Sequence, residues 1–207
     1  MKVLPKSFWV AYSLLNVAPI ARLLPSGLHL SPVKLLADDV PHEPLLLFNA
    51  YSVEARFMKG MRVDVQVFAR DELTNQAHLV ILDVISTTWD WNPIDGIRPP
   101  NANGKAALDT FHITTGDQHI DIRAKPTETR EIDFAFAVEA NRACYFRGFE
   151  KPFAMAFNET LVCQPVESMN ADVTNTLWSD CRELTPTHVF AHTLPMEFDV
   201  NVGHALW

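Results

Sequence analysis

The chain has 207 residues, of which 48% are hydrophobic and 20% are charged, a composition typical of a globular protein. Its 17 Lys and Arg residues stand against 25 Asp and Glu residues, so the formal net charge is −8. This balance argues against nucleic acid or an anionic membrane as the main partner, because both favour clustered positive charge.

The N-terminal segment places Lys2 and Lys6 before the apolar stretch 8–15, as a signal peptide would. However, polar residues interrupt that stretch, and Pro19 spoils a cleavage site of small residues. No run of about 18 apolar residues occurs, which excludes a transmembrane helix. We therefore expect a strand over 8–15 and a cytoplasmic protein.

The next elements are a short helix and a buried strand. Asn16 is suited to cap a helix over 17–24, and Pro19 lies near its start, where a missing N–H costs little. The strand predicted over 44–54 contains a continuous apolar run at 45–48. Because parallel or enclosed strands have this pattern, we expect both faces of that strand to be covered.

Two hairpins follow. Apolar and polar residues alternate strictly over 61–67, which predicts a strand with one solvent-facing side. A polar loop over 70–76 joins this strand, 61–69, to another over 77–88. A second, tighter hairpin is predicted from 111–114 to 118–123, with Gly116 supplying the positive φ of the turn.

The C-terminal third is predicted to hold three further strands and a helix. The helix is expected over about 169–178, because its apolar residues share one helical face. Those residues are Met169, Val173 and Leu177. The strands are expected over 131–138, 153–163 and 187–193.

Many strands with hairpin turns and little helix favour a barrel or a sandwich. Closing the sheet also removes the exposed edges that such strands would otherwise carry. The sequence therefore predicts a mainly β fold, a closed antiparallel β-barrel with two or so short helices. We expect it to form a single domain over 1–207.

Three segments follow one another in a recognisable order. They are the stretch 8–28, which ends in Leu24-Pro25-Ser26-Gly27-Leu28, the tetrapeptide Tyr51-Ser52-Val53-Glu54, and the stretch 95–106, which contains Gly96, Arg98 and Lys105. In order and spacing they resemble the acetoacetate decarboxylase superfamily, which includes uncharacterised bacterial relatives. The resemblance covers roughly residues 8 to 125.

The resemblance implies a barrel of the acetoacetate-decarboxylase type and a lyase that acts on a keto acid or related carbonyl compound. Lys105 would form the Schiff base, Glu54 would be its acid–base partner, and Arg98 would hold the substrate carboxylate. Trp89 and Trp91 lead directly into this segment and are expected to form a wall of the pocket. No cofactor is implied, and by analogy with oligomeric relatives a homo-oligomer is an alternative to a monomer.

Two departures from the family pattern favour a different function. The family places a second lysine where this chain has Ala106, and an arginine near the position of Phe8. Without a neighbouring cation, only an apolar pocket would keep Lys105 neutral, as the nucleophile must be. The alternative is therefore a non-catalytic β-barrel that binds a small hydrophobic ligand.

Each candidate residue also has a simpler interpretation. Lys105 lies among Gly, Pro and Asn residues, as a solvated loop lysine would. Arg98 is suited to tether its own loop, and Glu54 to form a surface pair. Arg62 and Asp64 share one strand face and are interpreted as another surface pair. Core packing is the alternative for the tryptophans.

No metal site is expected. Cys144, Cys163 and Cys181 form no Cys-x-x-Cys motif and are predicted to be reduced thiols. His188 and His192 would lie about 13 Å apart on a strand, too far for one ion. The histidines that flank the second hairpin, His112 and His119, are suited to face each other but have no evident third ligand.

Overall fold

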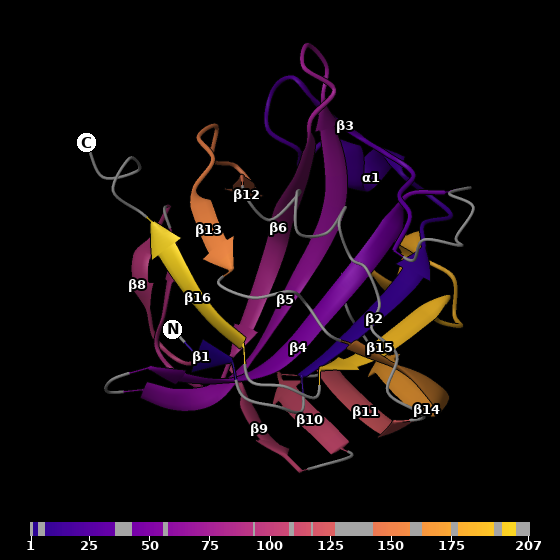
Figure 1. Cartoon of the computed structure of the whole chain (residues 1–207), viewed down its shortest axis with the longest axis vertical. Coiled ribbons are helices and arrows are strands. Elements are labelled where there is room, and N and C mark those ends of the chain that lie inside the picture. The colour runs from indigo at the N-terminus through magenta and orange to yellow at the C-terminus, as the bar shows by residue number, and fades with distance from the viewer. Residues whose placement is uncertain are drawn as a thin grey trace.

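The computed structural model describes residues 2–3, 7–35, 43–55, 58–92, 94–107, 110–116, 118–126, 143–157, 163–174, 178–192 and 196–201. These residues form a mainly β fold, as the sequence predicts (Figure 1). The elements are β1 (Lys2–Val3), β2 (Ser7–Ser13), α1 (Ala18–Ala21), β3 (Leu28–Leu30), β4 (Leu45–Ala55), β5 (Met58–Asp71), β6 (Ala77–Ser86), β7 (Asp90–Asn92), β8 (Gly96–Arg98), β9 (Asn103–Ala106), β10 (Thr110–Thr115), β11 (Gln118–Pro126), β12 (Cys144–Phe146), β13 (Ala154–Phe157), β14 (Cys163–Thr174), the 3-10 helix η1 (Ser179–Cys181), β15 (His188–His192) and β16 (Met196–Asn201).

One large sheet curls through most of the molecule in the strand order β12-β6-β5-β4-β2-β15-β14-β11-β10-β9. Most neighbours are antiparallel, but β12 runs parallel to β6, which the prediction of a wholly antiparallel sheet did not include. Strand β16 pairs with both β1 and β13, and this group joins the rest of the sheet where β1 pairs with β4. Figure 1 shows β13 and β16 to the left of the strands β4, β5 and β6.

The predicted closure into a barrel is not found as a strand ladder in the part of the chain that the structure describes. The path of paired strands begins at β12 and β6 and ends at β9, with no pairing that joins β9 to β6 or β5. The curl nevertheless brings the two ends together, because the backbone N–H groups of Asn101 and Ala102 both donate to Ser86 O, at 3.0 and 3.1 Å. The sheet is therefore curled, and its two ends are joined by hydrogen bonds between Ser86 and residues 101–102, a junction called the seam below.

Asn101 is the main link across this seam. Its side-chain Nδ2 donates to Val84 O at 3.0 Å, and its Oδ1 accepts from the Ser86 backbone N–H at 2.7 Å. Its carbonyl oxygen accepts a hydrogen bond of 2.6 Å from Thr115 Oγ1, at the end of β10. The amide side chain thus takes the place of a neighbouring strand beside the edge of β6.

Replacing Asn101 with alanine removes both side-chain bonds to β6. Because a typical hydrogen bond contributes about 1 kcal/mol net, we expect a loss of about 1–2 kcal/mol in unfolding free energy. Amide hydrogen exchange should show faster exchange at Ser86, and the matched control is Asn103→Ala on the neighbouring exposed strand. Unchanged protection of the Ser86 amide would show that the seam does not depend on Asn101.

The predicted strands and turns agree well with β2, β4, β5, β6, β10, β11 and β15. The turn between β10 and β11 contains Gly116 with φ 56°, as predicted. In the loop between β5 and β6, Asp71 Oδ1 accepts the backbone N–H groups of Leu73 and Thr74 and so stabilises the turn. The strand predicted over 131–138 lies outside the described residues, as does the end of the one predicted over 153–163.

The two predicted helices have different outcomes. The first exists as the short helix α1, and Asn16 Oδ1 accepts a 3.3 Å hydrogen bond from the Ala18 N–H at its start. The second prediction is wrong for residues 169–174, which belong to β14 and pair with β11. A spacing of four residues, as between Met169 and Val173, fits a strand period of two as well as a helix.

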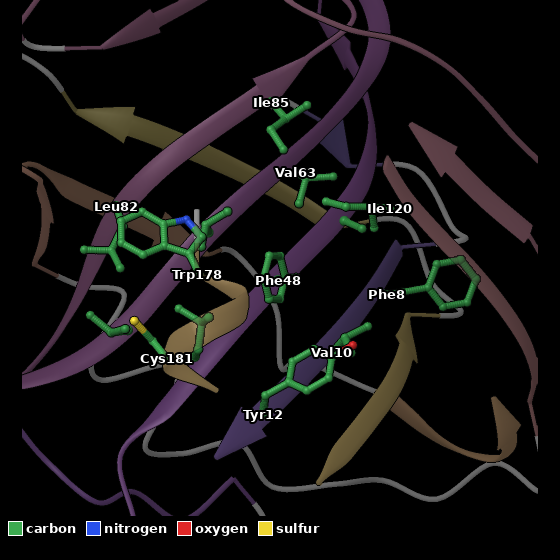
Figure 2. Packing of buried hydrophobic residues seen from close by; sticks show 14 of the residues in the cluster. Phe8, Val10, Tyr12, Phe48, Val63, Leu82, Ile85, Ile120, Trp178 and Cys181 are labelled. Atoms are coloured by element: carbon green, nitrogen blue, oxygen red, sulfur yellow. The ribbon is translucent and has the colours of Figure 1, made fainter. Parts of the chain in front are cut away.

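The two faces of the curled sheet carry separate apolar clusters. The inner, concave face holds the larger cluster, drawn from β2, β4, β5, β6, β10 and β11 together with Trp178 and Cys181 (Figure 2). The outer face of β2, β4, β5 and β6 is covered by β12, Phe153 and the segment 33–35. The side chains of β4 are accordingly buried on both faces over 45–48, as its apolar run predicts.

No helix within the described ranges is long and apolar enough to cross a membrane.

Candidate ligand site on the inner face of the sheet

The inner face is lined mostly by aromatic and branched apolar side chains. Tyr12 and Phe48, from neighbouring strands, are both 0% exposed and pack edge to face with ring centroids 5.8 Å apart. Trp178, which precedes η1, packs into the same cluster (Figure 2). The other large side chains of this lining include Phe8, Phe111, Ile113, Ile120 and Ile122. These side chains form one buried apolar cluster.

A buried arginine lies at one end of this lining. Arg182 follows η1 and forms a β-bridge with Leu14, at the end of β2. Its guanidinium carbon is 3.9 Å from the Tyr12 ring centroid, and the residue is only 7% exposed. Its Nη1 donates to Glu183 O at 2.8 Å. The structure thus places a positive charge against the rings of an otherwise apolar cluster.

Strand β9 lies at the end of the inner cluster opposite Arg182. The register of its pairing with β10 decides which of its residues face inward. Gly104 pairs with Ile113 and Ala106 pairs with Phe111, and both partners are buried in the inner cluster. Directly paired residues of an antiparallel ladder share a face, so Gly104 and Ala106 lie on the inner side. Lys105, which pairs with His112, lies on the opposite side.

The two predicted catalytic residues are not brought together. All four residues of β9, including Lys105, are exposed. The Glu54 side chain is 50% exposed on β4, and its Oε2 lies 3.9 Å from Lys59 Nζ. Glu54 therefore takes part in an exposed pair of the kind that the simpler interpretation expected, although its partner is Lys59.

The predicted substrate-binding residues lie on or beside the small hairpin β7–β8. The Arg98 guanidinium pairs with the Asp95 carboxylate three residues earlier, so it tethers its own loop. Trp89 is 52% exposed and lies just before β7. Trp91 belongs to β7, but its side chain lies outside the described part.

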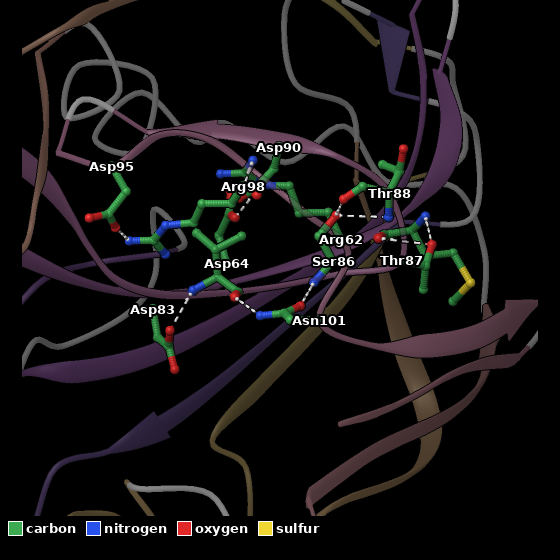
Figure 3. A network of polar contacts seen from close by, with 12 residues as sticks. Arg62, Asp64, Asp83, Ser86, Thr87, Thr88, Asp90, Asp95, Arg98 and Asn101 are labelled. Atoms are coloured by element: carbon green, nitrogen blue, oxygen red, sulfur yellow. Dashed lines mark hydrogen bonds and ion pairs between the residues drawn. The ribbon is translucent and has the colours of Figure 1, made fainter. Parts of the chain in front are cut away.

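A buried polar cluster on the outer face was not predicted (Figure 3). Arg62 Nε donates to Asp64 Oδ1 at 2.6 Å, and Tyr51 Oη donates to Asp64 Oδ2 at 2.9 Å. Arg62 Nη1 also lies 3.6 Å from Asp90 Oδ2. The interpretation of Arg62 and Asp64 as a surface pair is wrong, because their side chains are only 12% and 7% exposed.

Burial raises the pKa of several groups in and beside this cluster. It raises the pKa of Tyr51 well above its ordinary value and also raises the pKa of Asp90, against the opposing effect of Arg62. The pKa of Asp83 is raised by burial as well, although the Val84 backbone N–H donates to its carboxylate. The folded protein therefore binds a proton at these carboxyls more readily than the unfolded chain does.

Replacing Asp83 with asparagine is expected to stabilise the protein at pH 7. A carboxyl whose pKa is raised on folding lowers stability as the pH rises from the unfolded value of about 3.9 through the folded value. Asparagine removes that charge but keeps the oxygen that accepts the Val84 N–H. Urea unfolding at pH 7 and pH 4 should show the advantage of the variant at pH 7 fading at pH 4. An equal effect at both pH values would contradict the assignment.

The remaining sequence candidates form no further site in the described residues. His112 pairs with Asp121, with Nδ1 and Oδ2 3.8 Å apart, and His119 pairs with Thr114, so the two histidines do not face each other. No group of three or more metal-ligating side chains is found within the described ranges. Cys144 and Cys181 are buried free thiols, and burial raises the pKa of both.

The fold and the inner face together define a mainly β protein with a curled sheet around an apolar lining. Among solved structures, the chain is similar to the acetoacetate decarboxylase of Legionella pneumophila, with a TM-score of 0.56 and 10% sequence identity. The similarity covers 96% of this chain and 83% of that protein. It supports the relationship in fold that the sequence resemblance implies, and identity this low shows the fold alone. No family model and no curated protein sequence matches the chain.

Proposed function

We propose that this protein binds a small hydrophobic ligand on the inner face of its curled sheet and does not act through a lysine Schiff base. The observation that carries the proposal is the composition of the inner face. Side chains from seven strands of the sheet and from the segment around η1 form one apolar cluster there. Small curled or closed sheets commonly hold apolar ligands in this position.

The arrangement of β9 supports binding in preference to imine chemistry. A Schiff-base lysine needs an apolar surrounding that shields the amine from water. The inner positions of this strand are Gly104 and Ala106, while Lys105 lies on the outer side. A Cβ at Gly104 would lie 2.5 Å from the backbone oxygen of His112, so a larger side chain there requires β10 to move.

The same strand offers a route for a ligand. Gly104 and Ala106 are exposed although they lie on the inner side of the sheet, whereas their partners Ile113 and Phe111 are buried, so we propose that a ligand enters past this edge. The lining extends along β2 from Phe8 to Tyr12, about 13 Å for four residues of a strand. A ligand of that length would lie between the β9 edge and the Tyr12 end.

Titration with the neutral fluorescent dye N-phenyl-1-naphthylamine tests the proposal. We expect saturable binding, and Ala106→Trp should weaken it by about tenfold, or 1.4 kcal/mol, by narrowing the route along the inner face. The matched control is Lys105→Trp, which places the same ring on the outer side of the same strand. Absence of saturable binding, or equal effects of the two variants, would overturn the proposal.

A further inference from the structure

The exposed strand β9 begins with a chemically reactive dipeptide. Asn103-Gly104 is the one Asn-Gly step in the sequence, and both of its residues are exposed. Asparagine followed by glycine is the pair in which the next backbone nitrogen most readily attacks the side-chain amide, because glycine has no Cβ to hinder the approach. The dipeptide thus combines this chemical tendency with access to solvent.

The ladder of β9 with β10 directs the attacking nitrogen away from its neighbour strand. The Ala107 N–H donates to Thr110 O at 2.8 Å, which makes these two residues a hydrogen-bonded pair. Hydrogen-bonded and non-hydrogen-bonded pairs alternate along an antiparallel ladder, so Gly104, three residues earlier, forms a non-hydrogen-bonded pair with Ile113. The Gly104 N–H therefore points toward the edge at which the path of paired strands ends in the described part of the chain.

Asn101, two residues before Asn103, has the opposite arrangement. Its Nδ2 and Oδ1 are both hydrogen-bonded to β6, and the N–H of the next residue, Ala102, donates to Ser86 O. Both the nitrogen that would attack and the amide that would leave are therefore held in place. Within the described ranges, no hydrogen bond holds the side-chain amide of Asn103 or the N–H of Gly104.

The fold itself requires the glycine that makes this step reactive. A Cβ at position 104 would lie 2.5 Å from the backbone oxygen of His112, so a larger residue there requires β10 to shift. Asn103 is the first residue of β9, and the ends of elements open most easily. Rotation at Asn103 toward the Gly104 nitrogen therefore needs only the first pair of the ladder to open.

We infer that Asn103 is a site of spontaneous deamidation. The Gly104 nitrogen attacks Cγ of Asn103 and gives up its proton to water or hydroxide. The bond from Cγ to Nδ2 breaks, and the amide leaves as ammonia with a proton taken from water. A water molecule then opens the resulting succinimide at either of its two carbonyl groups, which leaves aspartate or isoaspartate at position 103.

The modification changes the edge of the sheet. Alternate residues of a strand share a face, so either product adds a negative charge on the face that carries Lys105. Isoaspartate also lengthens the backbone by one carbon atom, which displaces residues 104–106 relative to β10 and should weaken the pair of Lys105 with His112. This inference depends on β9 alone and stands whether or not the inner face binds a ligand.

Peptide mapping by mass spectrometry, after incubation of the folded protein at pH 8.5, tests the inference. We expect the amide of Asn103 to be converted to a carboxyl group at least about tenfold faster than that of Asn101, the control within the same chain. Because the attacking nitrogen must lose a proton, the reaction should be slower at pH 6. Fragmentation of the peptide backbone distinguishes aspartate from isoaspartate.

The variant Asn103→Gln should stay unmodified, because its longer side chain would have to close a larger ring. After incubation, amide hydrogen exchange at His112 should be faster in the parent and unchanged in this variant, since His112 pairs with Lys105. Equal rates of conversion at Asn103 and Asn101 would overturn the inference. Conversion of Asn103 that occurs only after unfolding in urea would also overturn it, because the folded edge would then protect the residue.

Discussion

Replacing Arg62 with methionine should lower the free energy of unfolding by about 3–5 kcal/mol, the usual cost of removing one partner of a buried ion pair. The methionine fills a similar volume, but it removes the guanidinium from the buried Asp64 carboxylate, which keeps the hydrogen bond from the Tyr51 hydroxyl. It also removes the cation that faces Asp90 on β7, so the hairpin β7–β8 should be held less firmly. Urea unfolding at pH 7 measures the effect.

The matched control for this experiment is Arg98→Met, which breaks an exposed ion pair within one loop. Exposed pairs contribute about 0–1 kcal/mol, so this variant should unfold almost as the parent does. Similar losses for the two variants would mean that burial does not distinguish the two pairs, contrary to the structure.

Replacing Phe48 with alanine should cost about 3–5 kcal/mol, the range for removing a fully buried aromatic side chain. Phe48 is 0% exposed at the centre of the inner cluster, where it packs against the Tyr12 ring. Thermal and urea unfolding measure the loss. The control is Leu73→Ala, because Leu73 is 95% exposed in the loop after β5 and its removal leaves no cavity. A loss below about 1 kcal/mol for Phe48→Ala would contradict the packing of the inner cluster.

Local residue patterns were sufficient to predict β2, β4, β5, β6, β10, β11 and β15, but β14 and most of the short strands were not predicted. The strand over 61–69 and the hairpin around Gly116 follow from residue types within a few positions of each other. The prediction of a helix over 169–178 was wrong because the apolar spacing fits both the helical period of 3.6 residues and the strand period of two. The pairing of β14 with β11 decides in favour of the strand. Whether the sheet closes was beyond local patterns, since it depends on contacts between Ser86 and Asn101 across the seam.

The candidate site was harder to predict because a strand's register decides which residues face inward. Lys105 and Gly104 are neighbours, and a shift of one residue in the pairing of β9 with β10 would exchange their faces. The burial of Arg62 on β5 depends on its contact with Asp90 on β7. The whole of β6 separates these two strands in the sequence. Arg182 gave no sequence signal, because its burial follows from the bridge to Leu14 and the contact with Tyr12.

The proposed function requires an inner face that binds ligands without a reactive lysine. Intact-mass spectrometry after incubation with pyruvate or acetoacetate and borohydride tests it most directly, with Lys105→Ala and Lys59→Ala measured alongside the parent. We expect no adduct that depends on Lys105, because that residue lies exposed on the outer side of β9. A stable adduct that is present in the parent and in Lys59→Ala but absent from Lys105→Ala would contradict the proposed function and establish imine chemistry at Lys105.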